Sequence, residues 1–148
     1  RKTTPGMRAL EKYAVRMGGG TNHRLSLSDA ALIKDNHIAA AGGVVAAFSL
    51  VHEKFPTSEI EIEVDNLQQL RDVLPLKPGL VLLDNMSPDQ CAEAVALVDG
   101  AIKLEASGGI TFSNAKAYAN SGVNYLAIGS LTHSAPALDI GLDFRKGK

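Results

Sequence analysis

Four charged or polar residues follow directly behind an apolar run in the first quarter of the sequence. In "LIKDNH" (32–37), Lys34, Asp35, Asn36 and His37 come after the apolar residues 30–33. So abrupt a change either marks the exit of a strand into solvent or assembles side chains with a chemical role. The strands and helices that carry these residues distinguish between the two interpretations.

Other charged residues also stand at or near the ends of apolar runs. They are Arg1 and Lys2, Lys34 and Asp35, Glu61 and Glu63, Asp84, and Lys103 and Glu105. Removing an ionised carboxylate from water costs several kcal/mol, so a cluster of such groups needs compensating cations, ligands or a metal ion. Salt bridges that serve only the fold are the alternative, above all for Lys103 and Glu61.

Basic residues gather near the start of the chain. "RKTT" and "GGGTNHR" supply Arg1, Lys2, His23 and Arg24, and Lys34 follows on the next apolar run. Guanidinium groups bind carboxylates through paired hydrogen bonds, so this group suits a compact dianion. A solvated loop is the alternative for His23 and Arg24. No two histidines share ligand spacing on one element, so a histidine metal site is not expected.

Two glycine-rich turns follow later apolar runs. They are "EASGGIT" (105–111) and "AIGSLTHS" (127–134), and their candidate residues are Ser107, Gly108, Gly109, Gly129 and Ser130. Exposed backbone N–H groups and a helix N-terminus form a recurrent phosphate site in such loops. Glycines also end strands for conformational reasons, but two such turns in consecutive units favour a phosphate site.

Short β-branched or aliphatic runs alternate with helical spacing along the chain. The predicted strands are 31–35, 59–64, 80–84, 101–105 and 125–129, with "RKTT" (1–4) as the end of a first strand and "LDIGLDF" (138–144) as a last one. Helical spacing covers about 7–17, 44–51, 67–74, 88–98 and 112–120. This alternation predicts parallel β-α units, whose strand ends meet at one edge of the sheet.

The phase of the charges favours a barrel over an open sheet. In "EIEIEV" (59–64) the isoleucines share one face and the glutamates share the other. Interior strands of a doubly wound sheet are covered on both faces and read as nearly continuous hydrophobic runs. A barrel accommodates the alternation, because one strand face packs on helices and the other lines the interior. "KDNH" is then expected to enter a pocket shared with the other strand ends.

The whole sequence predicts one soluble globular domain. Of its 148 residues 45% are hydrophobic, and 15 basic and 16 acidic residues give a net charge of −1. That balance favours neither nucleic acid nor an anionic membrane as a partner. No apolar run approaches the roughly 20 residues that cross a bilayer, so a cytoplasmic location is expected. Cys91 is the single cysteine and cannot form an internal disulfide.

Six motifs along the chain resemble one enzyme family. They are "RKTTPGMR", "GGGTNHRLSLSDAALIKDNHI", "EIEVDN", "LVLLDNM", "KLEASGGI" and "AIGSLTHS". In this order, and over nearly the whole chain, they closely resemble the quinolinate phosphoribosyltransferase family. The resemblance implies transfer of a phosphoribosyl group from phosphoribosyl pyrophosphate to quinolinate with Mg²⁺. The products would be nicotinate mononucleotide, pyrophosphate and CO₂, in NAD biosynthesis.

The resemblance also implies roles for individual residues. Arg1, His23, Arg24 and Lys34 match the quinolinate carboxylate pocket, with Lys2 between it and the sugar phosphate. Glu63 and Asp84 match acids that hold the ribose hydroxyls and the associated Mg²⁺. Ser107, Gly108, Gly129 and His133 match the 5′-phosphate site. The expected catalytic residues are Lys2, Glu63, Asp84 and Glu105.

The implied fold is an α/β barrel, incomplete with about seven parallel strands, of the type II phosphoribosyltransferase kind, in a homodimer or higher homo-oligomer. Residues 1–148 are expected to be its catalytic domain. The family's N-terminal sandwich domain and its short C-terminal continuation have no counterpart in this sequence, so we expect a fragment with little or no activity alone. Two alternatives stay open: a related phosphoribosyltransferase for another aromatic acid, and a non-catalytic phosphate-binding barrel.

Overall fold

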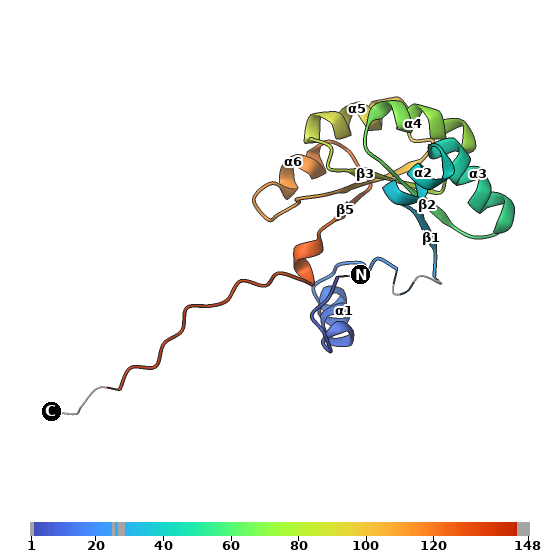
Figure 1. Ribbon diagram of the computed structural model, residues 1–148. Coiled ribbons are helices and arrows are strands. Elements are labelled where there is room, and N and C mark those ends of the chain that lie inside the picture. Colours follow the sequence, from blue (N-terminus) through green and yellow to red (C-terminus); the bar gives the residue numbers. More distant parts are fainter. Residues whose placement is uncertain (1, 25, 27–28, 145–148) are drawn as a thin grey trace.

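Five parallel strands form one sheet, and helices connect consecutive strands (Figure 1). The computed structural model describes residues 2–24, 26 and 29–144. The strands are β1 (Ala31–Ile33), β2 (Ile60–Val64), β3 (Leu80–Asp84), β4 (Lys103–Ser107) and β5 (Tyr125–Ala127). Their order in the sheet is β1-β2-β3-β4-β5, so all five C-terminal ends lie at one edge, named here the carboxyl edge.

Helices cover one face of the sheet, while α1 lies apart on the other side (Figure 1). The helices are α1 (Arg8–Met17), α2 (Asp35–Ala41), α3 (Val44–Lys54), α4 (Leu67–Val73), α5 (Pro88–Val98) and α6 (Ala115–Asn120), with short 3₁₀ turns η1 (Leu74–Leu76) and η2 (Gly129–Leu131). No helix in the described part of the chain has the length and apolar character needed to cross a membrane.

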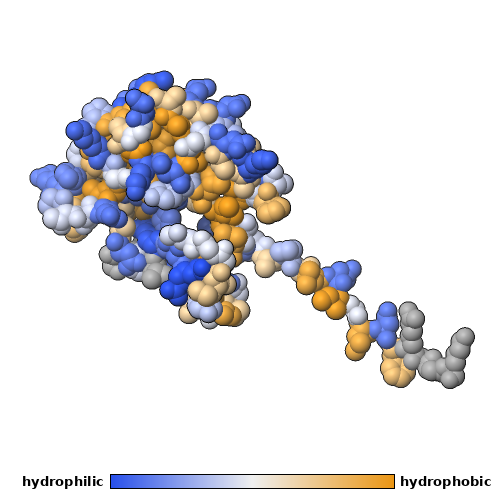
Figure 2. Space-filling view, turned by 180° about the vertical axis from the view of Figure 1, so that it is seen from behind, coloured by the Kyte–Doolittle hydropathy of each residue, from blue (hydrophilic) through white to orange (hydrophobic). Residues whose placement is uncertain are grey.

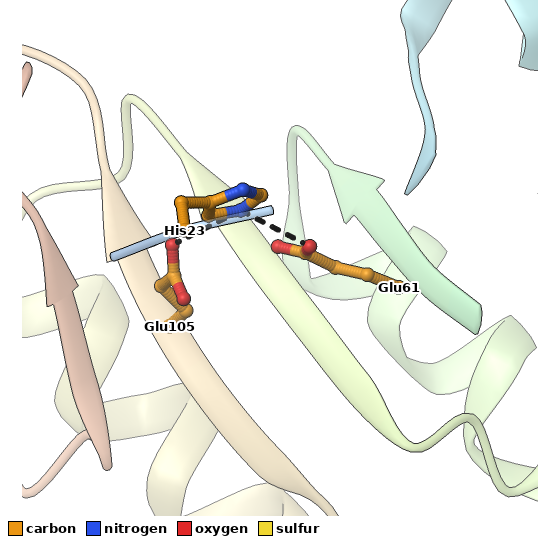
Figure 3. Close-up of side chains that lie close together, drawn as sticks. All are labelled: His23, Glu61 and Glu105. Atoms are coloured by element: carbon orange, nitrogen blue, oxygen red, sulfur yellow. Dashed lines mark ion pairs between the residues drawn. The ribbon is translucent and has the colours of Figure 1, made fainter. Parts of the chain in front are cut away.

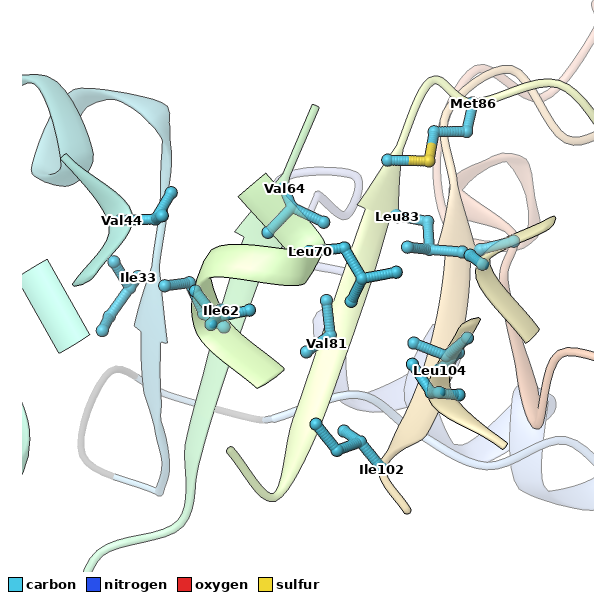
Figure 4. Packing of buried hydrophobic residues seen from close by; sticks show 14 of the residues in the cluster. Ile33, Val44, Ile62, Val64, Leu70, Val81, Leu83, Met86, Ile102 and Leu104 are labelled. Atoms are coloured by element: carbon cyan, nitrogen blue, oxygen red, sulfur yellow. The ribbon is translucent and has the colours of Figure 1, made fainter. Parts of the chain in front are cut away.

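The helix-covered face is apolar because alternate residues of each strand point to it. Ile62 of β2 is in register with Val81 of β3, which is in register with Leu104 of β4, and all three are buried. Leu70 of α4 packs over this row (Figure 4), and Cys91 of α5 belongs to the same buried cluster. Burying one large aliphatic side chain contributes about 1.5–3 kcal/mol, so this layer holds the sheet in place.

Side-chain caps fix where α4 and α5 begin. Asn66 accepts a hydrogen bond from the backbone N–H of Gln69 at 3.0 Å, and Ser87 accepts one from that of Gln90 at 3.3 Å. The Gln90 side chain in turn accepts from the Ser87 N–H at 2.8 Å, which completes a capping box. The connections after β2 and β3 are therefore short and well defined beside the carboxyl edge.

The parallel β-α units are as predicted, but the sheet has five strands where about seven are expected. Within the described residues, 2–4 and 138–144 have no strand structure. "LDIGLDF" has the alternation of a strand, yet a strand forms only where a neighbour satisfies its backbone groups. Residues 138–144 run away from the sheet instead (Figures 1 and 2), and Leu138 is 78% exposed.

Two elements differ locally from the predictions. The strand predicted over 101–105 spans Lys103–Ser107, so Lys103 starts β4 at the opposite end from the carboxyl edge. There Lys103 is exposed and donates to the Tyr125 hydroxyl at 3.4 Å, which places it away from the predicted pocket. Helix α2 begins at Asp35, directly where the sequence predicts only the exit of a strand.

Candidate active site

Carboxylates line the sheet face that lies opposite the apolar core. Glu61 and Glu63 come from β2, Glu105 from β4, and each is only 7% exposed. Glu63 and Glu105 share one row, because both are in register with Leu82 of the strand between them. The alternation in "EIEIEV" therefore predicts this face correctly. Buried carboxylates at such density require positive partners.

His23 is the positive or polar partner of two of these carboxylates (Figure 3). Its Nε2 lies 3.2 Å from Glu61 Oε2 and 3.9 Å from Glu105 Oε1. Within the described residues, the buried Oε1 atoms of Glu61 and Glu105 have no hydrogen-bond partner. His23 comes from the irregular segment 20–24, so contacts with the sheet and with α1 must position its ring.

The environment of Glu105 favours its protonated form. Burial and then the neighbouring Glu61 carboxylate raise the pKa of Glu105 to about 7, against the opposing effect of His23. Glu105 is thus partly protonated near neutral pH. Burial likewise raises the pKa of Glu63, against the opposing effect of Lys34. The sheet face that carries these glutamates therefore favours cationic or protonated partners.

Lys34 connects the start of α2 to this face. Its Nζ lies 3.0 Å from Glu63 Oε2, and its side chain is 47% exposed. The backbone N–H of Lys34 donates to His37 Nδ1 at 3.0 Å, which caps the first turn of α2. The "KDNH" stretch therefore leaves its strand directly into a helix that His37 caps, while Lys34 contacts a carboxylate of the sheet.

A second group of cations lies between α1 and the segment 20–24. A cavity there is lined by Ala9, Lys12, Arg16, Asn22, His23, Arg24 and Asp29. Lys12 Nζ donates to the His23 carbonyl oxygen at 3.5 Å, and burial lowers the pKa of Lys12. Sequence reasoning missed Lys12 and Arg16, because helical spacing shows only that they lie on a helix and not which segment that helix faces.

Three carboxylates converge at the carboxyl edge. Oxygens of Glu63, Asp65 and Asp84 lie within 4.8 Å of one another. Sequence reasoning selects Glu63 and Asp84 but misses Asp65, although Asp65 directly follows β2 in "EIEVDN". Hard oxygen donors are the ligands that Mg²⁺ prefers, so this donor set fits that ion. Asn85 Nδ2 donates to Asp84 Oδ2 at 2.7 Å and orients the carboxylate.

The turn after β4 contains two glycines with positive φ angles. Gly108 and Gly109 have φ angles of +96° and +59°, which favour glycine over other residues. The backbone N–H of Asn85 donates to the Ser107 carbonyl oxygen at 2.9 Å. A Cβ on Gly108 would stand 2.9 Å from the Asn85 nitrogen, so the two loops are in close contact. Glycine is therefore needed for conformation and for space.

The turn after β5 lies beside it, because Ser107 is in register with Ala127. The His133 ring packs against Gly129 so closely that a Cβ there would overlap it. Thr132 Oγ1 donates to the Lys2 carbonyl oxygen at 2.8 Å, which brings the N-terminal segment to this turn. Both glycine turns and Lys2 thus gather at one part of the carboxyl edge.

The predicted site residues fall into three groups in the structure. His23 and Lys34 reach neighbouring carboxylates of β2, and the acids Glu63 and Asp84 lie together. The glycine turns are adjacent, as described above. Arg24 is turned partly aside, because its Nη1 donates to the Ala30 carbonyl oxygen at 3.0 Å. Arg1 lies outside the described residues.

These features define a class of protein: a parallel α/β domain whose carboxyl edge combines acids, cations and glycine turns that suit anionic ligands. The chain belongs to a known family of this class. The family described as "Quinolinate phosphoribosyl transferase, C-terminal domain" matches residues 1–143. The resemblance found in the sequence motifs is thereby confirmed.

Named relatives agree with this family. The "Nicotinate-nucleotide pyrophosphorylase [carboxylating]" of Mycobacterium leprae is 55% identical over 97% of this chain and 51% of its own length. A probable enzyme of the same name from Bacillus subtilis is 46% identical, over 97% and 50%. The crystal structure of NadC from Streptococcus pyogenes matches with a TM-score of 0.87 at 43% identity, covering 94% of this chain and 49% of that one. The chain spans about half the length of these relatives.

Proposed function

We propose that this domain provides the phosphoribosyl-transfer site of a quinolinate phosphoribosyltransferase. The reaction joins quinolinate to phosphoribosyl pyrophosphate and releases pyrophosphate and CO₂, giving nicotinate mononucleotide for NAD biosynthesis. Family membership and the names of the relatives support this activity. The observation that carries the proposal is the convergence of Lys34, Glu63, Asp84 and the two glycine turns at one carboxyl edge.

Quinolinate carries two carboxylates and therefore needs several cations. We assign its pocket to His23, Arg24 and Lys34, together with Arg1 outside the described residues. Lys34 lies at the start of α2 and His23 above the middle of β2, so each reaches the same sheet face from a different element. The further cations Lys12 and Arg16 border the cavity beside His23 and add to the positive potential there.

Phosphoribosyl pyrophosphate would bind across the later strands. Ser107, Gly108, Gly129 and His133 are assigned to the 5′-phosphate, since the two turns are adjacent and expose backbone donors. Lys2 is held beside the second turn through its carbonyl oxygen and is placed between the phosphate and the quinolinate pocket. Glu63 and Asp84 are assigned to the ribose hydroxyls.

Mg²⁺ would be held by Glu63 and Asp84, in part through the substrate, with Asp65 as a further oxygen donor. When bound, the ion offsets the negative charge of the pyrophosphate leaving group. The chain's own carboxylates act on the sugar. Loss of pyrophosphate develops positive charge at the anomeric carbon, and we assign its stabilisation to Glu63 and Asp84, with Glu105 contributing in its ionised form.

Decarboxylation follows from the same charge distribution. After the pyridine nitrogen joins the sugar it is cationic, so it stabilises the electron pair left on C2 when the 2-carboxylate leaves as CO₂, and a proton from solvent then takes the place of the carboxylate at C2. A covalent nucleophile is not needed for either step. Lys34 and His23 orient the one carboxylate that remains in the pocket, and exclusion of water from the pocket would favour both steps.

For the whole protein we propose an incomplete barrel of about seven strands that continues the present sheet at its open edges β1 and β5, in a homodimer or higher homo-oligomer. A cytoplasmic location is proposed for it as well. Residues 1–148 form its catalytic barrel domain in this proposal.

Titration calorimetry with three ligands tests the function. Binding of both quinolinate and phosphoribosyl pyrophosphate, with nicotinate much weaker, is expected, because nicotinate lacks the second carboxylate. Preference for nicotinate or another aromatic acid would indicate a related phosphoribosyltransferase. Binding of inorganic phosphate alone would indicate a non-catalytic phosphate-binding domain and overturn the proposal.

A further inference from the structure

Both ring nitrogens of His23 have defined partners. Nδ1 accepts a hydrogen bond from the backbone N–H of Arg24 at 2.9 Å, so Nδ1 carries no proton. The proton of the neutral ring is then on Nε2, which faces Glu61 Oε2 at 3.2 Å (Figure 3). The two contacts together select one tautomer and one orientation of the ring.

The same tautomer argues against a metal ion at this place. Atoms of His23, Glu61 and Glu105 lie within 4.8 Å of one another and have the chemistry of metal ligands. A metal-binding histidine, however, coordinates through an unprotonated nitrogen and donates from the other one. His23 has the opposite arrangement, because its Nδ1 accepts a hydrogen bond and its protonated Nε2 is the nitrogen that faces the carboxylates. The contacts among His23, Glu61 and Glu105 therefore serve to hold the segment that carries His23.

This segment, 20–24, has neither helix nor strand structure. The Asn22 side chain donates to the Lys12 carbonyl oxygen at 2.9 Å, and Arg24 Nη1 donates to that of Ala30 at 3.0 Å. These bonds join the segment to α1 and to the start of β1. Among the described residues, the contacts of His23 with Glu61 and Glu105 join it to the middle of the sheet.

Glu61 maintains this contact at a cost to folding. Its carboxylate is 7% exposed, and within the described residues Oε1 has no hydrogen-bond partner. An unsatisfied buried polar atom destabilises the folded state, and an apolar side chain of similar size is often neutral or stabilising there. Local violations of this kind occur mainly at functional sites, so Glu61 is a candidate for a functional role.

We propose that Glu61 is a positioning residue: it holds His23 in the Nε2–H tautomer and so fixes the segment that carries His23 and Arg24 over the quinolinate pocket. This inference rests on the proposed function for its effect on quinolinate, but not for its effect on the ring. Glu61 lies on β2, an interior strand of the sheet. Its contact with His23 therefore fixes a segment without regular structure relative to the sheet.

Two variants and one control test this role in the full protein that contains residues 1–148. Glu61→Gln keeps an acceptor for Nε2–H, whereas Glu61→Met keeps the length of the side chain and removes the acceptor. Glu59→Gln is the matched control, because Glu59 is an exposed acid beside the same strand. Glu61→Leu replaces Glu61→Met if that variant does not fold.

The first measurement is the ¹⁵N NMR signature of the histidine ring, assigned to His23 by comparison with His23→Gln. The parent protein, Glu61→Gln and Glu59→Gln should show the Nε2–H tautomer. Glu61→Met should show a mixture, because a ring without the Glu61 contact can rotate away from the Arg24 N–H that keeps Nδ1 unprotonated. The second is quinolinate affinity, which should fall about tenfold or more in Glu61→Met and far less in Glu61→Gln. In both Glu61 variants the affinity for phosphoribosyl pyrophosphate should be unchanged. The melting temperature should be unchanged or raised.

An unchanged His23 signature in Glu61→Met would overturn the proposal, whatever the enzyme binds. So would an altered tautomer without any loss of quinolinate affinity, because the ring would then not position the pocket. If the parent protein binds no quinolinate, the proposed function fails, while the NMR comparison still decides whether Glu61 sets the tautomer.

Discussion

Lys34 Nζ and Glu63 Oε2 lie 3.0 Å apart although 29 residues separate them in the chain. The pair joins the first residue before α2 to the polar face of β2, and so connects the group assigned to quinolinate with the group assigned to ribose. Because the Lys34 side chain is 47% exposed, solvent screens the attraction, and such pairs contribute only about 0–1 kcal/mol to folding. Under the proposed function, the Lys34–Glu63 pair therefore contributes mainly to ligand binding.

Lys34→Ala should therefore weaken quinolinate binding strongly and leave stability nearly unchanged. A hydrogen bond to a charged group is worth about 1.5–3 kcal/mol, so we expect roughly a tenfold to hundredfold rise in the dissociation constant. The melting temperature should stay within a few degrees of the parent value. Calorimetric titration and thermal unfolding of the same preparation measure both. A variant that unfolds would show that the pair is structural.

Glu63→Gln and Asp84→Asn should lower turnover more than they weaken quinolinate binding. Their proposed partners are the ribose and Mg²⁺, and charge on the ribose develops only in the transition state. We expect about a hundredfold lower kcat, with a quinolinate dissociation constant within a few-fold of the parent. Unchanged kcat together with a raised quinolinate KM would refute the assignment. Asp65→Asn is the graded comparison, because Asp65 is exposed and lies at the margin of this carboxylate group.

Gly129→Ala should disturb the turn assigned to the 5′-phosphate without strain in the backbone. An added Cβ would overlap the His133 ring, which must then move away from its place beside the turn. Affinity for phosphoribosyl pyrophosphate should fall about tenfold, with quinolinate affinity unaffected. Gly141→Ala is the control, since a Cβ there has nothing within 4 Å. Equal affinities in the two variants would remove His133 from the phosphate site.

The strands that position the site were predictable because their alternation is strong. "EIEIEV" places apolar and acidic residues on opposite faces at once, and the structure keeps that phase in β2. In "AIKLE" the same signal gives the correct faces but not the bounds, since β4 starts two residues later, at Lys103. A shift by an even number keeps each face but moves Lys103 from the predicted pocket to the far end.

Features that depend on partners were not predictable from local pattern. Residues 138–144 alternate as a strand does, but alternation does not say whether a neighbouring strand is present to bond with them. Helix α2 starts with a histidine cap at His37, a signal far weaker than the serine cap of α5. The place of Asp65 beside Asp84 depends on the pairing of β2 with β3, which brings two loops together.

The last prediction concerns Glu105 and pH. Burial and the Glu61 carboxylate raise the pKa of Glu105 from 4.5 to about 7, so the folded state binds this proton more tightly than the unfolded state. The contribution of the protonated form to stability is fully present below about pH 4.5 and is lost as pH rises through about 7.

The free energy of unfolding should accordingly decrease by on the order of 2 kcal/mol between pH 5 and pH 8. The complete pKa shift of Glu105 corresponds to roughly 3 kcal/mol at 1.36 kcal/mol per pKa unit, but part of it falls below pH 5. Glu105→Gln imitates the neutral carboxyl group, so it should be more stable than the parent at pH 8 and show a flatter profile. Urea unfolding of both proteins across this range measures the difference. Parallel profiles would show that Glu105 is ionised throughout. Glu53→Gln, at an exposed position on α3, should run parallel to the parent and exclude a general effect of removing one acid.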